Sequence, residues 1–305
     1  MTVAPILRAT HVRRTPEEAF RLFTEHIGAW WPLTTHSVLD GRAVAMAFVD
    51  GTIVERTVDG EERSWGTVVA WEPPARVVFS WHPGRPAEEA TEVEVRFIGD
   101  DHGTRVELEH RGWERLGPGA EQLRLGYTGP SAWGAVLDHY ADAADRIDGA
   151  PQLADLREAY AAFYAEARQG GFGTPPDGEW TAEQVVAHVA LTDAEMARVC
   201  RRLIDQREAT FDNTAVQDAT NLHRCIGGRD LGALVADAAR ASEDYLLVLA
   251  RLDDDQLATE VPCHLTDHGE VMVDAPMPWG RLAHTVQAER HLPLHTAQLA
   301  ALRRP

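Results

Sequence analysis

Apolar and polar positions alternate in short runs through the first half of the chain, and this alternation predicts β-strands. Val93, Val95 and Phe97 alternate with charged residues, and the pattern recurs around Val106 and Leu108. Pairs of turn-forming residues separate such runs at hairpin-like intervals: Asp50-Gly51, Asp59-Gly60, Pro73-Pro74, Pro83-Gly84 and His102-Gly103. The pattern therefore predicts a long antiparallel meander.

Helical patterns bracket these strands. Thr15, Pro16 and Glu18 form a helix start, because threonine caps the first turn, proline suits the first helical position and the carboxylate reaches back. An apolar stripe follows at spacings of three and four: Phe20, Phe23, Ile27 and Trp30/Trp31. A second stripe begins at Trp133 and ends at Ile147. We expect an α+β helix-grip fold, in which a curved antiparallel sheet wraps around a long C-terminal helix and leaves an apolar ligand cavity.

Aromatic residues are the candidate lining of that cavity. Seven of the nine tryptophans lie in this half of the chain. Trp71, Trp81 and Trp133 could stack on a flat ligand, or they could be ordinary core residues. His110 falls on the same, inward face of its predicted strand as Val106 and Leu108. It is therefore either a hydrogen-bonded interior histidine or a base facing the cavity.

Several segments of this half carry a resemblance to a known family. "FRLFTEHIGAWWPL", "GTVVAWEPPARVVFSWHP" and "GTRVELEHRGWERLG" look like the START-like SRPBCC superfamily, in the branch similar to the activator of the heat-shock-protein ATPase. The resemblance covers residues 1–150 and implies a domain that binds apolar ligands. It implies no reaction, because one fold hosts many functions.

The second half of the chain reads as helices after a linker at Gly149-Ala150-Pro151. A helix from about Leu153 ends at Gly170-Gly171, and a capping box at Thr181 and Gln184 begins another. Two further amphipathic patterns cover Asp230 to Leu252 and Trp279 to the end. Residues 151–305 are therefore predicted to form an all-α four-helix bundle. Two long connections interrupt it, 206–229 and 253–278, and the latter contains a hairpin that turns at His268-Gly269.

Three histidines of the bundle are candidate metal ligands. His291 and His295 belong to a seam at bundle spacing that also includes His284, Ala288 and Leu299. His188 lies at the edge of the buried face of the second helix. A divalent ion would satisfy imidazoles that are otherwise buried without partners, and imidazole suits Zn, Ni, Fe or Cu. The alternatives are histidines that are merely core residues, and a rival zinc site at Cys263, His264 and His268.

A second resemblance concerns these histidines. "EWTAEQVVAHVA" followed by "ERHLPLHTAQL" resembles the DinB-like superfamily, which includes the N-terminal domain of mycothiol-dependent maleylpyruvate isomerase. The resemblance implies that His188, His291 and His295 hold a divalent metal, with zinc expected and nickel or iron as alternatives. Pro293 departs from the family pattern, because proline removes a backbone hydrogen bond and kinks a helix.

Composition narrows the range of partners. The formal net charge is −19, which disfavours nucleic acid and anionic lipid, so we expect a small-molecule partner. No apolar run reaches the length of a membrane span and no signal peptide is evident, so we expect a cytoplasmic protein. All 29 basic residues are arginine, which excludes lysine-based catalysis. The three cysteines lack CxxC spacing and indicate free thiols.

The chemistry expected of a three-ligand metal site is thiol activation. A thiol bound to such an ion ionises near neutral pH, so the site predicts a thiol S-transferase or a thiol-assisted isomerase acting on a small electrophile. The second resemblance implies that the thiol is of the mycothiol type. Glu195 and His284 are candidates for a catalytic role. Two alternatives are a non-enzymatic binder of small hydrophobic ligands and a chaperone cofactor. A homodimer is an option, because helical bundles of this kind often pair.

Overall fold

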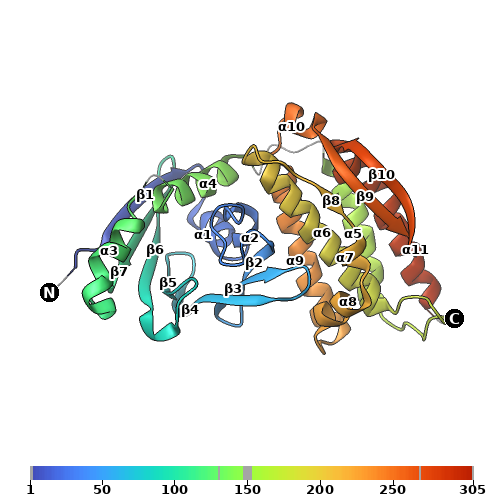
Figure 1. The fold of residues 1–305 in the computed structure, drawn as a ribbon, viewed down its shortest axis with the longest axis horizontal. Coiled ribbons are helices and arrows are strands. Elements are labelled where there is room, and N and C mark those ends of the chain that lie inside the picture. The colour runs from blue at the N-terminus through green and yellow to red at the C-terminus, as the bar shows by residue number, and fades with distance from the viewer. Residues whose placement is uncertain (1–2, 130, 147–152, 268, 304–305) are drawn as a thin grey trace. The chain divides into compact units, whose positions relative to one another are not determined.

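The computed structural model describes residues 3–129, 131–146, 153–267 and 269–303, and these divide into two compact units (Figure 1). The first unit comprises residues 1–56 and 62–148, and the second comprises 57–61 and 149–305. The predicted linker at Gly149-Ala150-Pro151 lies outside the described residues. Among the residues that the structure describes, no helix is both long and apolar enough to cross a membrane.

The first unit is built on a seven-stranded antiparallel sheet with the order β1-β7-β6-β5-β4-β3-β2. The strands are β1 (Ile6–Val12), β2 (Ala43–Val49), β3 (Thr52–Thr57), β4 (Glu62–Glu72), β5 (Arg76–Trp81), β6 (Thr91–Asp100) and β7 (Gly103–Arg111). The predicted Asp50-Gly51 turn joins β2 to β3 with positive φ angles of 48° and 75°, as a two-residue hairpin requires. The meander is confirmed.

Register sets which residues of the sheet are buried. Val93 pairs with His110, Val95 with Leu108 and Phe97 with Val106, and all six side chains face the buried side. The charged residues between them lie on the opposite face, where Arg111 bonds Glu92 and Glu94. One side of the sheet therefore needs a helical cover.

Helices α1 (Pro16–Thr24), α2 (Ile27–Trp30), α3 (Ala120–Gly126) and α4 (Trp133–Arg146) accompany the sheet, with short 3-10 turns η1 (Ala87–Glu89) and η2 (Trp113–Gly119). The predicted capping box of Thr15 and Glu18 begins α1. Phe23 packs on Phe97 at 5.6 Å and on Tyr140 of α4 at 5.3 Å, and the Tyr140 hydroxyl donates to the Ala19 carbonyl at 2.8 Å. These contacts clamp α4 over the sheet, which confirms the helix-grip prediction; Ile147 lies outside the described residues.

The second unit contains long helices with a small sheet. The helices are α5 (Ala154–Gln169), α6 (Ala182–Ile204), α9 (Leu231–Leu249), the π-helix η5 (Arg281–His291) and its continuation α11 (Leu292–Leu302), and the short ones are α7 (Thr214–Gln217), α8 (Ala219–Ile226) and α10 (Asp254–Ala258). The second predicted capping box, Thr181 with Gln184, begins α6. The core lies between these helices, where Tyr160, Val185 and Tyr245 are fully or almost fully buried.

The unit is not all-α, contrary to the sequence prediction. Strands β8 (Phe211–Asp212), β9 (Glu260–Asp267) and β10 (Glu270–Pro278) form a three-stranded sheet with the order β10-β9-β8. The hairpin of β9 and β10 was expected, but β8 joins it from a segment that was expected to be irregular. Phe211 helps to hold β8 in this sheet, because its buried ring packs on the Trp279 ring, with 5.9 Å between the ring centroids. His268 of the predicted turn lies outside the described residues.

Candidate metal centre

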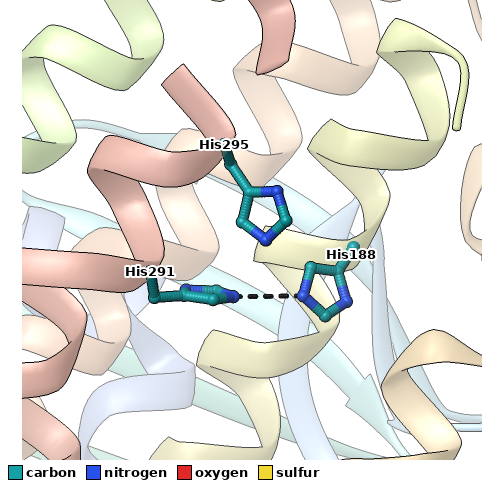
Figure 2. A group of neighbouring side chains, drawn as sticks. All are labelled: His188, His291 and His295. Carbon is teal, nitrogen blue, oxygen red and sulfur yellow. Dashed lines mark hydrogen bonds between the residues drawn. The ribbon is translucent and has the colours of Figure 1, made fainter. Parts of the chain in front are cut away.

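Three histidines from two helices meet in the second unit. His188 of α6, His291 at the end of η5 and His295 of α11 each offer a ring nitrogen, and the three nitrogens lie within 4.8 Å of one another. Figure 2 shows the three rings turned toward a common centre. Within the described ranges of the chain, no other group of three or more His, Cys, Asp or Glu residues gathers in this way. The structure therefore brings together the residues expected to be ligands.

The helix that carries two of them changes its winding next to Pro293. Proline has no N–H to continue the α-helical ladder, and the helix changes from π to α winding at Leu292, just before it. A π-helix has i to i+5 hydrogen bonds and hence a wider turn, so its inward positions differ from those of an α-helix. Gln287 is buried where Ala288 was expected, while His291 and His295 keep their inward faces across the junction.

Hydrogen bonds outside the cluster orient two of the rings. His188 Nδ1 lies 2.9 Å from the Val216 carbonyl oxygen, which can only accept, so Nδ1 carries the hydrogen. His295 Nδ1 donates in the same way to Gln298 Oε1 at 2.9 Å. Both rings therefore direct the lone pair of Nε2 toward the centre, which is the arrangement of a metal-binding histidine with an outer hydrogen-bond partner.

His291 differs from the other two histidines in its hydrogen bonds. Its Nε2 lies 3.0 Å from His188 Nε2, and because His188 Nε2 has no hydrogen, His291 is the donor. This bond leaves His291 Nδ1 as a buried atom with no hydrogen-bond partner among the described residues. A buried polar atom without a partner is unfavourable, so this ring nitrogen is an exception among buried polar groups.

Burial keeps all three imidazoles neutral. It lowers the pKa of His188 to about 3, with a further contribution from His295, and it lowers the pKa of His291 well below the ordinary range. Burial lowers the pKa of His295 as well. Neutral imidazole is the form that binds metal. Two ligands of a tetrahedral zinc ion, each about 2.0 to 2.1 Å from it, lie roughly 3.3 Å apart. The Nε2 atoms of His188 and His291, 3.0 Å apart, are close to this spacing, and the ring nitrogen of His295 lies within 4.8 Å of both.

Trp180 is a member of the site that the sequence analysis missed. Its ring lies 4.7 Å from the His188 ring and stacks on the His295 ring at 6.1 Å, between centroids. It occupies the position before the N-cap of α6 and is half-buried. The only sequence signal was an aromatic residue directly before a capping box. Trp180 forms an aromatic wall beside two of the three candidate ligands.

The two candidates for a catalytic role lie apart from the cluster and have partners of their own. Glu195 receives two hydrogen bonds from Arg198 Nε at 2.9 Å and one from Nη2 at 2.5 Å. His284 Nε2 bonds Asp155 Oδ1 at 2.8 Å. Glu195 lies about two helical turns from His188, and His284 lies seven residues before His291. Neither joins the three-histidine group.

The rival zinc site does not assemble among the described residues. Cys263 and His264 are neighbours on β9, so their side chains point to opposite faces of the strand. The Cys263 thiol donates to the Val261 carbonyl at 3.1 Å, and His264 pairs with Asp274 at 3.3 Å. The third member, His268, lies outside the described residues.

Three of the four expected cavity residues come together in the first unit. Trp81 and Trp133 rings lie 5.2 Å apart, and Trp133 Nε1 donates to His110 Nδ1 at 2.9 Å. Trp71 lies elsewhere, 42% exposed, with Phe20 at 5.2 Å between ring centroids. The aromatic rings at this place contact one another as a packed core does.

Hydrogen bonds define the state of His110. Its Nδ1 accepts from Trp133, so its Nε2 carries the hydrogen, which it donates to Thr91 Oγ1 at 2.7 Å. Thr91 in turn donates to the Trp81 carbonyl at 2.9 Å. Burial lowers the pKa of His110 to about 3. With both ring nitrogens occupied, His110 is a structural relay rather than an available base.

A surface pocket of about 420 Å³ lies on the charged face of the same sheet. Its lining mixes arginine and glutamate with a few apolar side chains: Leu7, Arg8, Ala9, Glu94, Arg96, Arg105, Glu107, Leu108 and Glu109. This lining is unlike the apolar cavity that the sequence predicts. We assign no ligand to this pocket.

Comparison with known proteins supports the class of the first unit. Residues 13–138 match the family model described as Activator of Hsp90 ATPase homolog 1-like protein. The N-terminal part of the chain is therefore an AHSA1-like domain of the SRPBCC type, as its sequence segments indicated. No curated protein matches the chain.

The chain aligns over its first half with several solved structures. One is an anthrahydroquino-gamma-pyrone synthase, 30% identical, covering 46% of this chain and 97% of its own, with a TM-score of 0.34. The self-sacrificing resistance protein CalC from Micromonospora echinospora is 24% identical, covers 48% and 97%, and has a TM-score of 0.38. The Aha1 dimer from Colwellia psychrerythraea is 16% identical, covers 47% and 97%, and has a TM-score of 0.33.

Proposed function

We propose that this protein is a metal-dependent thiol S-transferase or thiol-assisted isomerase that acts on a small electrophile. The observation that carries the proposal is the convergence of His188, His291 and His295, whose ring nitrogens lie within 4.8 Å of one another in a buried site. We expect zinc as the ion, with nickel or iron as alternatives, because imidazole nitrogen binds all three.

The residues of the site favour thiol activation. When bound to three protein ligands, a divalent ion retains an open position at which it lowers the pKa of a thiol. His188 and His295 are held by Val216 and Gln298, so the chain supplies ligands of fixed orientation. The half-buried Trp180 gives the thiol or its electrophile an aromatic surface. The thiolate sulfur forms a bond to an electrophilic carbon, and the leaving group departs with its electron pair or, in isomerisation, the thiolate is later expelled.

We propose mycothiol, or a thiol like it, as the co-substrate, on the resemblance of the α6 and α11 segments to the DinB-like superfamily. The AHSA1-like domain would supply a second place for an apolar ligand. Its aromatic residues Trp81 and Trp133 are the first to examine for contact with such a ligand.

A direct test follows thiol consumption. The protein is incubated with low-molecular-weight thiols, including mycothiol, and with a panel of epoxides, alkyl halides and unsaturated dicarboxylates. We expect a chelator or His291→Ala to abolish consumption, and His11→Ala, which changes an exposed histidine paired with Asp100, to leave it unchanged. Consumption that survives both the chelator and His291→Ala would contradict the proposal.

A second candidate is a non-enzymatic binder of small hydrophobic ligands, which is favoured by the AHSA1-like domain. Native mass spectrometry that finds a co-purified apolar ligand, together with no thiol consumption by metal-loaded protein, would favour it. A role as a chaperone cofactor has only the name of the matched family in its favour, and a pull-down that recovers no chaperone would exclude it.

A further inference from the structure

Three buried polar atoms on the two helices that carry the histidine cluster have no hydrogen-bond partner among the described residues. They are Thr192 Oγ1, Gln287 Oε1 and His291 Nδ1. Thr192 and Gln287 are themselves almost completely buried, 4% and 1% exposed. Burying a polar atom without a hydrogen bond costs about 1 to 3 kcal/mol, so three in one region call for an explanation.

The register of the two helices places Thr192 opposite the stretch that carries Gln287 and His291. His188, Thr192 and Met196 follow one another at i+4 along the buried face of α6. His188 contacts His291, with 3.0 Å between their Nε2 atoms, and Gln287 Nε2 donates to Met196 Sδ at 2.8 Å. Thr192 lies between His188 and Met196, so it faces the stretch between His291 and Gln287.

The Thr192 hydroxyl lacks the hydrogen bond that a helical threonine commonly makes within its own helix. A helical threonine commonly donates to the carbonyl four residues earlier, as Thr24 does to Phe20 and Thr296 does to Leu292, both at 2.7 Å. Thr192 lies within α6 and makes no such bond. Its hydroxyl is therefore free to bond a group on the neighbouring helix.

The side-chain amide of Gln287 also lacks strong hydrogen-bond partners. Its amide nitrogen donates only to a thioether sulfur, a weak acceptor, and its carbonyl oxygen has no donor. The wider turn of the π-helix places this amide inward, one turn before His291. An acceptor at this place complements a donor on the His291 ring.

Metal binding requires a hydrogen-bond acceptor for the His291 ring. His291 Nε2 carries a hydrogen while it donates to His188 Nε2, and a ligand nitrogen must have a free lone pair. For Nε2 to become the ligand atom, the neutral ring must carry its hydrogen on Nδ1 instead. Val216 and Gln298 accept that hydrogen from the other two rings, whereas no described residue accepts it from His291.

We propose that Thr192 and Gln287 are positioning residues that, through one shared buried water, stabilise His291 in the tautomer that binds the metal. This inference rests on the proposed metal centre. Before metal binds, the water accepts from the Thr192 hydroxyl and donates to Gln287 Oε1 and His291 Nδ1. Afterwards the ring hydrogen is on Nδ1, and only the water–His291 bond reverses its direction. Three hydrogen bonds are what a buried water typically makes.

The proposed water bridge predicts that changing Thr192 or Gln287 lowers the affinity for zinc. Removing an outer partner of a ligating histidine typically weakens metal affinity by roughly 10- to 100-fold. We expect Thr192→Val, which keeps the shape and removes the hydroxyl, to weaken zinc binding by about that factor. Gln287→Met removes the acceptor and gives a second, independent variant. Thr296→Val is the matched control, because its hydroxyl bonds its own helix next to His295.

Two measurements on the full chain test the proposal. Zinc affinity is measured by competition with a chromophoric chelator, and the His291 tautomer is measured by 15N NMR of histidine-labelled protein with and without zinc. We expect His291 to change from the Nε2–H to the Nδ1–H form when wild type binds zinc, and both variants to bind more weakly than wild type and the control.

The outcomes separate this inference from the proposed function. A wild type that binds no zinc would overturn both. A wild type that binds zinc while Thr192→Val and Gln287→Met bind within about threefold of Thr296→Val would overturn the positioning role alone, as would a His291 ring that stays in the Nε2–H form with zinc bound. Urea unfolding of each variant establishes that the comparison is made on folded protein.

Discussion

A buried carboxylate in the helical unit should make its stability fall as pH rises, and Asp193→Asn should remove this effect. Asp193 of α6 is fully buried and accepts hydrogen bonds from the Tyr160 hydroxyl of α5 and the Ser242 hydroxyl of α9, both at 2.5 Å. The Tyr164 hydroxyl lies 2.6 Å from Ser242. This network joins three helices, one of which carries His188.

The magnitude follows from the pKa of Asp193. Burial raises it from 3.8 to about 7, against the opposing effect of the hydrogen bonds from Ser242 and Tyr160. Since the folded state binds the proton more tightly, its stability is greatest below the unfolded pKa and declines as pH rises from about 4 to about 7. A rise of about three pKa units corresponds to about 4 kcal/mol lost by pH 7.

The assay compares wild type with Asp193→Asn in excess chelator. The asparagine amide can still accept from Tyr160 and donate to Ser242, but it does not titrate. Urea unfolding is followed by NMR signals of α6 residues from pH 4 to pH 8, so the unfolding of the helical unit is observed by itself. Taking the difference between the two proteins cancels the titration of the histidines, which is common to both.

We expect the variant to gain stability over wild type as pH rises to about 7, with no further change above it. Asp177→Asn, at an exposed position of the same unit, should show no such gain. A difference between wild type and Asp193→Asn that is constant from pH 4 to pH 8 would refute the reasoning, because it would mean that Asp193 titrates alike in both states.

Two further predictions concern the histidine cluster. Because burial lowers the pKa of His188 to about 3, protons should compete weakly with metal above pH 5, and zinc affinity should change by less than about tenfold between pH 7 and pH 5.5. Three exposed histidines would lose roughly 600-fold over that range, and a loss of that size would contradict the neutral cluster. Trp180→Phe should retain metal binding but remove most of the fluorescence quenching by cobalt(II), since Trp180 contacts two candidate ligands. Quenching equal to that of wild type would place the ion elsewhere.

The sequence predicted much of the framework because local signals and tertiary structure agree. The capping boxes at Thr15 and Thr181 begin helices at those residues. Alternation placed Val95 and Phe97 on the buried face of the sheet. Helical spacing placed His291 and His295 on one face, and these patterns depend only on the period of the element.

Other features of the centre depend on contacts that a sequence does not display. The Val216 carbonyl that orients His188 is a backbone atom, and any residue could supply it. The π-helix exchanged the inward positions of Ala288 and Gln287, which an α-helical period cannot anticipate. The contact between Trp180 and His188 joins the segment before α6 to the second turn of that helix, and no helical period predicts it. The seam prediction failed for His284, which pairs with Asp155 instead.

Elemental analysis shows whether His188, His291 and His295 hold one divalent ion. The measurement uses untagged protein that has never contacted a nickel column, before and after dialysis against zinc, beside His291→Ala treated identically. We expect one equivalent of divalent metal per chain for wild type and a substoichiometric amount for the variant. Wild type without metal even after zinc loading, or equal metal in both proteins, would contradict it.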